Sequence, residues 1–211
     1  MLFAARASFA TLVLAAVSGA QVIESGRFAA NQITGLFCAV EVNVTGSRRV
    51  DTRTWLFLPG NRISSVYPFG GVFDPARCSG DTCGTYTIGS GQISVRWDGG
   101  RVDQLPLELA GEDSIRLNGK LFRPARVVTS ESLVGRWGDA SSNIYTFDAN
   151  GRFNFGTGSS LGLGGAYRVQ GFTLILSFSD GDVRRRALFG TSATGEPLGM
   201  ISVDREVFAR K

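Results

Sequence analysis

The sequence predicts an all-β protein built from two tandem antiparallel meanders, each of about eight short strands. Two observations lead to this fold class. Apolar and polar residues alternate and then stop at glycine-rich turns, and the same pattern recurs later in the chain. Residues 165–182 repeat residues 84–101 at an offset of 81 positions, so that Tyr167, for example, corresponds to Tyr86. No long segment has the period of a helix.

The duplication continues on both sides of this repeat. In chain order, residues 35–37 correspond to 135–137, 55–63 to 145–153, 84–101 to 165–182 and 115–122 to 201–208. The offset therefore runs 100, 90, 81 and 86. The first copy thus has about ten extra residues before Trp55 and nine before Gly84, and the second has about five around 193–197. In a structural repeat, such insertions are expected in loops.

Eight strands are expected in the second copy, and the first copy repeats their order. They are predicted at residues 135–139, 143–148, 152–155, 165–169, 172–178, 182–189, 198–203 and 206–210. The short connections favour hairpins, and a meander hides its edge strands by closing into an up-and-down barrel; a β-sandwich is the alternative. The two repeat domains are predicted at residues 21–125 and 126–211, with a linker over 124–132.

The first twenty residues have the pattern of a secretory signal. Arg6 is their only charge, residues 7–17 are mostly apolar, and small residues lead up to Ala20. We expect cleavage near Ala20 and a mature protein that is secreted or periplasmic. No other stretch is long and apolar enough to span a membrane.

Three cysteines in an exported chain allow one disulfide. Cys78 and Cys83 are close enough in sequence for a short bridge, which would leave Cys38 as a buried free thiol in a strand. The alternative pairs Cys38 with one of the other two and closes a longer loop, which stabilises more in the chain-entropy picture.

Charge and composition exclude several function classes. The chain has 22 basic and 18 acidic residues, and its only basic cluster, residues 184–186, is expected on a solvated strand face rather than in a nucleic-acid site. It has no histidine, the commonest general base and metal ligand. No serine lies in a nucleophile elbow, and the acidic pairs 112–113 and 180/182 fall in predicted turns. The sequence therefore predicts a protein that is not an enzyme and uses no metal or other cofactor.

The sequence Gly135-Arg136-Trp137 stands on the first predicted strand of the second meander. A Gly-x-Trp motif followed by a sequential meander resembles the lipocalin-like (calycin) barrels. The first copy departs from the motif, with Phe37 in place of the tryptophan. The resemblance implies that the tryptophan closes one end of the barrel and that the interior holds a small, usually apolar ligand.

The candidate ligand-binding residues are expected at the barrel mouths. They are Trp97, Trp137 and the glycine-rich segment 156–165, with Gly158 and Gly162 in a mobile rim. The expected partner is a small apolar ligand or an extracytoplasmic protein. The alternative is a structural or protein-interaction role, including inhibition of a secreted hydrolase, in which the same aromatic residues simply fill the cores. An interior cavity of about 300 Å³ or more would favour a ligand, and solid cores would exclude one.

Overall fold

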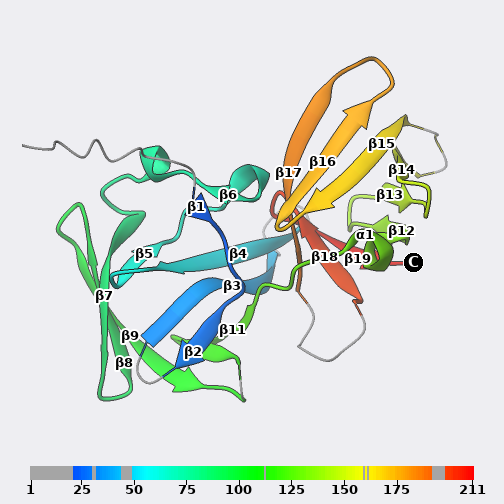
Figure 1. Cartoon of the computed structure of the whole chain (residues 1–211). Helices are drawn as coiled ribbons and strands as arrows, with labels where there is room; N and C mark the ends of the chain where they lie inside the picture. The colour runs from blue at the N-terminus through cyan, green and yellow to red at the C-terminus, as the bar shows by residue number, and fades with distance from the viewer. Residues whose placement is uncertain are drawn as a thin grey trace, which may run out of the picture.

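The protein consists of two closed antiparallel β-barrels that lie side by side (Figure 1). A computed structural model describes residues 21–29, 32–43, 49–111, 113–158, 160, 162–191 and 198–211. The predicted pair of barrels is confirmed, and the β-sandwich alternative is wrong because the first and last strands of each copy are hydrogen-bonded. The signal predicted over residues 1–20, the second-copy insertion at 193–197 and Glu112 lie outside the described residues.

The first barrel has eight strands and closes where β11 pairs with β3. Arg123 of β11 stands opposite Cys38 of β3. A short strand, β2 (Arg27–Ala29), adds to β3 from outside this circuit. The eight strands are β3 (Gln32–Asn43), β4 (Arg49–Leu58), β5 (Arg62–Ser64), β7 (Cys83–Gly89), β8 (Gln92–Trp97), β9 (Val102–Leu109), β10 (Ile115–Leu117) and β11 (Lys120–Pro124).

The second barrel repeats this order and closes where β12 pairs with β19, with Trp137 opposite Arg210. A one-turn helix, α1 (Ser130–Leu133), precedes it and begins in a capping box on Thr129. The strands are β12 (Gly135–Gly138), β13 (Asn143–Phe147), β14 (Arg152–Thr157), β15 (Leu163–Gln170), β16 (Thr173–Phe178), β17 (Val183–Gly190), β18 (Met200–Val203) and β19 (Glu206–Arg210).

Alternation of side chains gives each barrel its own interior core. The first interior is formed by Ile33, Phe37, Ala39, Phe57, Ile63, Tyr86, Ile93, Val95, Trp97, Leu107, Ile115, Leu117 and Phe122. The second is formed by Val128, Leu133, Trp137, Tyr145, Phe147, Phe153, Tyr167, Leu174, Leu176, Phe178, Leu188, Ile201, Val203 and Phe208. The apolar positions that match between the two copies thus point into the barrels.

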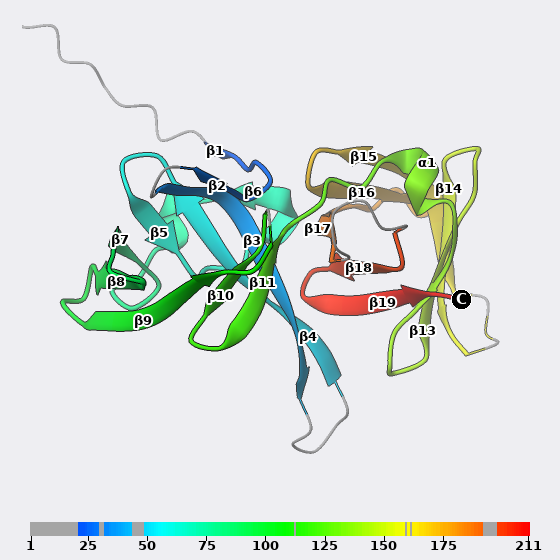
Figure 2. The ribbon, with the colours of Figure 1, turned by 90° about the horizontal axis from the view of Figure 1, so that it is seen from below.

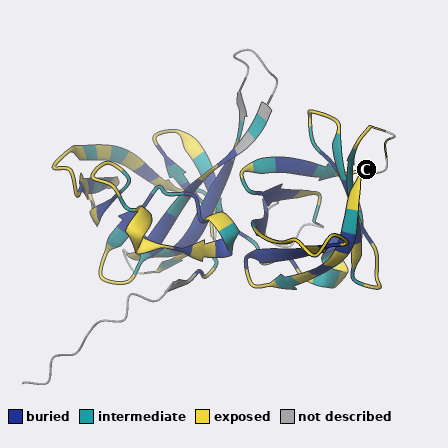
Figure 3. Cartoon of the chain, turned by 90° about the horizontal axis from the view of Figure 1, so that it is seen from above, coloured by how far each residue is buried: buried dark blue, intermediate teal, exposed yellow. Residues whose placement is uncertain are grey.

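A third apolar core lies between the barrels. Figure 3 shows buried segments, in dark blue, on the sides of the two barrels that face each other. The third core combines outward-facing residues of both walls with residues of the second insertion of copy one. Its members are Ile23, Leu36, Cys38, Leu56, Tyr67, Phe73, Cys83, Ala125, Phe172, Ala187 and Phe189. We call this cluster the junction core. It makes the two barrels one packed body.

The described residues of both first-copy insertions contribute secondary structure, whereas the sequence predicts loops there. The first lengthens β3 and β4, which stay paired out to Asn43 and Arg49 and project beyond the barrel wall (Figure 2). The second contains two short 3₁₀ helices, η1 (Phe69–Gly71) and η2 (Pro75–Arg77), and β6 (Val72–Phe73), which pairs with β1 (Gln21–Val22). Through Tyr67 and Phe73, the second insertion covers the junction core.

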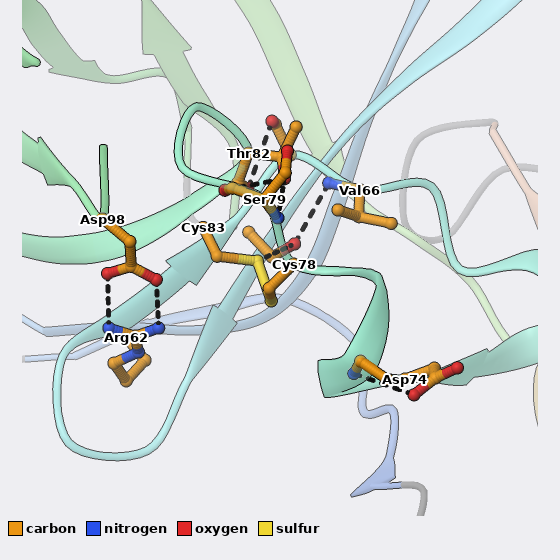
Figure 4. The surroundings of a disulfide bond; sticks show 11 residues. Arg62, Val66, Asp74, Cys78, Ser79, Thr82, Cys83 and Asp98 are labelled. Atoms are coloured by element: carbon orange, nitrogen blue, oxygen red, sulfur yellow. Dashed lines mark hydrogen bonds and ion pairs between the residues drawn. A yellow bond between two sulfur atoms is a disulfide. The ribbon is translucent and has the colours of Figure 1, made fainter.

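The disulfide joins Cys78 to Cys83, with 5.3 Å between their Cα atoms, at the end of the second insertion (Figure 4). Cys38 is a buried free thiol, so the short-loop pairing is confirmed and the longer-loop alternative is wrong. Burial raises the pKa of the Cys38 thiol to about 12. Among the described residues, no helix is long and apolar enough to cross a membrane.

Candidate ligand cavity of the second barrel

The two barrels differ most at the end where β8 turns into β9 and β16 turns into β17. In the first barrel this end is filled by two indole rings, since Trp55 and Trp97 lie 5.8 Å apart. The Trp97 Nε1 donates a hydrogen bond of 2.7 Å to Asp103, and the Arg101 guanidinium lies 5.0 Å above the Trp97 ring. Neither Trp55 nor Trp97 lines any of the cavities described below.

In the second barrel the corresponding residues are smaller and leave a cavity. Tyr145 stands at the position of Trp55, and Phe178 at that of Trp97. The cavity has a volume of about 190 Å³ and opens toward a polar rim. Its lining residues are Tyr145, Phe155, Leu163, Leu176, Phe178, Arg184, Arg186, Val203, Asp204, Glu206 and Phe208.

Tyr145 is the most buried polar residue of this lining. Tyr145 is 7% exposed, and its hydroxyl has no hydrogen-bond partner in the part of the chain that the structure describes. Burial raises the pKa of Tyr145 to about 12, against the opposing field of Arg186. The phenol is therefore neutral at physiological pH and can donate a hydrogen bond to an occupant of the cavity.

Two ion pairs organise the rim of the cavity. Arg186 donates to Asp204 at 2.8 Å, and the other Asp204 oxygen accepts the backbone N–H of Ala187 at 2.8 Å. Arg184 donates through Nε to Asp182 at 2.8 Å, while its guanidinium lies 4.7 Å from the centre of the Phe178 ring. Arg184 and Arg186 of the predicted solvated arginine cluster therefore line the cavity, although their side chains are 45% and 37% exposed.

The opposite end of the second barrel is closed. Trp137 is 0% exposed, and its Nε1 donates 2.7 Å to the carbonyl of Leu133 in α1. The Arg210 guanidinium lies 4.8 Å above the indole and donates 2.8 Å to the carbonyl of Ser132. Trp137 therefore joins the first strand, the last strand and α1 at the closed end.

Of the segment 156–165 predicted from sequence to contact a ligand, Leu163 lines this cavity, whereas Trp97, Trp137, Gly158 and Gly162 do not. Trp97 fills the first barrel, and Trp137 closes the second. Gly158 and Gly162 instead border a groove of about 520 Å³ with Arg136 and Asn154, whose side chains lie outside the second barrel's interior core.

Sequence reasoning missed Tyr145, Arg184, Arg186 and Asp204. A comparison of the two copies could have found two of these residues, because Tyr145 stands where the first copy has Trp55 and Arg186 stands where it has Leu105. A smaller ring and a charged residue at positions that are apolar in the first copy indicate that the second interior is not packed in the same way.

The size and chemistry of the cavity limit what it can hold. At about 190 Å³ it is smaller than the roughly 300 Å³ of a typical ligand pocket, but larger than a cavity of about 150 Å³ that takes up benzene. Among the described residues, no three histidine, cysteine or acidic side chains are grouped to hold a metal ion. No protein-family model, curated protein or solved structure matches the chain.

Proposed function

We propose that the protein is an exported, non-enzymatic binding module that holds one small, mostly apolar ligand in the second barrel. The observation that carries this proposal is the difference between the two matched barrel ends. Trp55 and Trp97 fill one, whereas Tyr145 and Phe178 leave a cavity of about 190 Å³ in the other. Export is supported by the predicted signal and by the disulfide.

The lining suggests the shape of the ligand. Phe155, Leu176, Phe178 and Phe208 would surround an apolar body of about the size of one aromatic ring. Tyr145 would donate a hydrogen bond to an acceptor atom on that body. A lipocalin-like relationship fits this arrangement, since the resemblance implies a tryptophan at the closed end and a ligand inside.

The experiment is a titration with toluene and benzyl alcohol, followed through the methyl NMR signals of Leu176 and Val203. Tyr145→Trp introduces the residue that fills the first barrel and is expected to abolish binding of both probes. Tyr145→Phe keeps the ring and is expected to bind toluene normally and benzyl alcohol more weakly. Binding that survives Tyr145→Trp would place the probes elsewhere, and probes that leave both methyl signals unmoved would refute the proposal.

The filled first barrel favours a second candidate, a structural or protein-interaction role, which includes inhibition of a secreted hydrolase. A barrel without an interior site can act only through its surface, and the disulfide borders an apolar surface groove with Leu58, Pro59 and Phe73. Native mass spectrometry of the protein from its own host separates the candidates. A small-molecule adduct supports the ligand proposal, and a bound protein supports the second candidate.

A further inference from the structure

A polar pocket of about 260 Å³ lies at the junction of the two barrels, apart from the cavity of the second barrel. Residues from three regions line it: the β3–β4 hairpin, the second insertion of copy one, and the β18–β19 turn of copy two. They are Glu41, Thr52, Arg53, Thr54, Ser65, Tyr67 and Arg205. Neither copy could form this junction pocket alone.

Arg205 brings a cation to the pocket from a turn that would suit glycine better. Its φ is 78°, in the left-handed region, and the corresponding residue of the first copy is Gly119 at φ 77°. The guanidinium lies 5.3 Å from the ring centre of Tyr67 and 5.4 Å from that of Phe69. No carboxylate among the described residues forms an ion pair with it. The strained turn thus holds at the junction a cation that none of the described carboxylates pairs with.

The other charges that line the pocket do not neutralise Arg205. Glu41, the one acidic residue among the described lining residues, accepts a 2.6 Å hydrogen bond from Lys120 and lies 3.7 Å from Arg53. Glu41 is thus shared by two cations. Among the described side chains, Arg205, Arg53 and Lys120 thus stand against the single carboxylate of Glu41, and this excess of positive charge attracts anions.

The Thr54 hydroxyl of the pocket leaves donor capacity unused. Thr54 is 3% exposed, and its Oγ1 has no hydrogen-bond partner in the described part of the chain. The Thr54 hydroxyl thus differs from those of Ser65, which donates to the Thr82 carbonyl, and Thr52, which donates to Ser202. An unpaired buried hydroxyl is costly, and rotation about χ1 exchanges the threonine hydroxyl with its methyl group. Thr54 can therefore offer a donor to an occupant of the pocket.

We infer that the junction pocket binds a small oxoanion of the phosphate or sulfate type. The guanidinium groups of Arg205 and Arg53 supply charge-assisted hydrogen bonds, and Thr54 supplies a neutral one. Because the pocket is built from both barrels, the bound anion stabilises the junction. This site is independent of the ligand proposed for the second barrel.

The test is calorimetric titration with inorganic phosphate at constant ionic strength, together with the melting temperature in phosphate and in chloride. Saturable binding by the wild-type protein is expected. Arg205→Gly, which installs the residue of the matching turn, is expected to lose it, whereas Arg96→Gln, a control on an exposed face of β8, is expected to retain it. Phosphate also stabilises proteins without binding. The deciding quantity is therefore the rise in melting temperature from chloride to phosphate in the wild type minus the same rise in Arg205→Gly.

Thr54→Val separates binding from a structural role. The variant keeps the side-chain shape and removes the unpaired hydroxyl, so its stability in chloride should be unchanged or higher. Its phosphate affinity should fall about tenfold, as expected for loss of one hydrogen bond to a charged group. A heat of binding that is absent in the wild type, or equal in the wild type and Arg205→Gly, would overturn the inference.

Discussion

Replacing Ser202 by alanine tests whether the polar contacts at the junction hold the two barrels together. The Ser202 hydroxyl is 0% exposed. It accepts a 2.9 Å hydrogen bond from Thr52 and lies 3.1 Å from the hydroxyl of Tyr67. Both partners belong to the first barrel's copy, and Ser202 belongs to β18 of the second. These contacts are therefore made only when the barrels are docked.

The alanine variant leaves two buried hydroxyls, those of Thr52 and Tyr67, without this partner. Thr52 is 4% exposed and Tyr67 is 2% exposed, so water replaces the lost contacts poorly. Tyr67 keeps its hydrogen bond with the Arg205 backbone, so the main loss is the stranded Thr52 hydroxyl, and we expect the free energy of unfolding to fall by about 1–3 kcal/mol. The assay is urea unfolding followed by far-ultraviolet circular dichroism.

A double-mutant cycle with Thr52→Val isolates the contact. Once Ser202 is alanine, the Thr52 hydroxyl has no partner to lose, so the double variant should cost less than the sum of the single variants by about 1 kcal/mol. Ser94→Ala, on the outer face of β8, is the control and should change stability by less than about 0.5 kcal/mol. A Ser202→Ala protein within about 0.5 kcal/mol of wild type would refute the reasoning.

Three further predictions concern the cysteines and one surface ion pair. Reduction of the Cys78–Cys83 disulfide should lower the free energy of unfolding by about 2 kcal/mol in urea, since a sequence separation of 5 closes only a small loop. Because burial raises the pKa of Cys38 to about 12, its stabilising effect is complete below pH 9 and is lost as pH rises toward 12. A Cys38→Ala variant should therefore show a flatter alkaline fall in melting temperature, and an unchanged slope would contradict this. Arg62→Ala should cost less than about 1 kcal/mol in urea unfolding, because Arg62 and Asp98 are 41% and 40% exposed; a larger loss would mean that the pair is better shielded than its exposure indicates.

The strands of the second copy could be predicted from the sequence because apolar and polar residues alternate along each of them. The expected strand 143–148 is observed as Asn143–Phe147, and 182–189 is observed as Val183–Gly190. Alternation and turn residues can be recognised from a short stretch of sequence, and here the same pattern occurs in both copies. The Cys78–Cys83 bridge was one of two pairings that the sequence left open, and the structure decides between them.

The junction core could not be predicted, because alternation does not say which of two apolar faces points inward. In β17 the consecutive residues Ala187, Leu188 and Phe189 are all buried, but Leu188 belongs to the interior of the second barrel and the other two to the junction core. The cavity was missed for a related reason. The cavity exists because Tyr145 fills less space than Trp55 does at the matching position of the first barrel. The alternation of apolar and polar residues does not show how much space a side chain fills.

The two copies also close their ends in different ways, and this difference bears on where function lies. In the second copy, Arg210 covers Trp137. The first copy has Phe37 and Pro124 at these positions, so both partners of the aromatic–arginine pair are changed together.

In the first copy, the segment before β2 takes over the closing role. A Cβ atom at Gly26 would collide with the Phe37 ring, so the backbone lies directly on that ring, and Ser25 donates a 2.8 Å hydrogen bond to the carbonyl of Ala125. The segment before β2 thus closes this end of the first barrel, and the indoles of Trp55 and Trp97 fill its other end. Each change in the first copy adds packing, whereas the changes in the second place Tyr145 and Arg186 around an open volume. The second barrel is therefore where a ligand should be sought first.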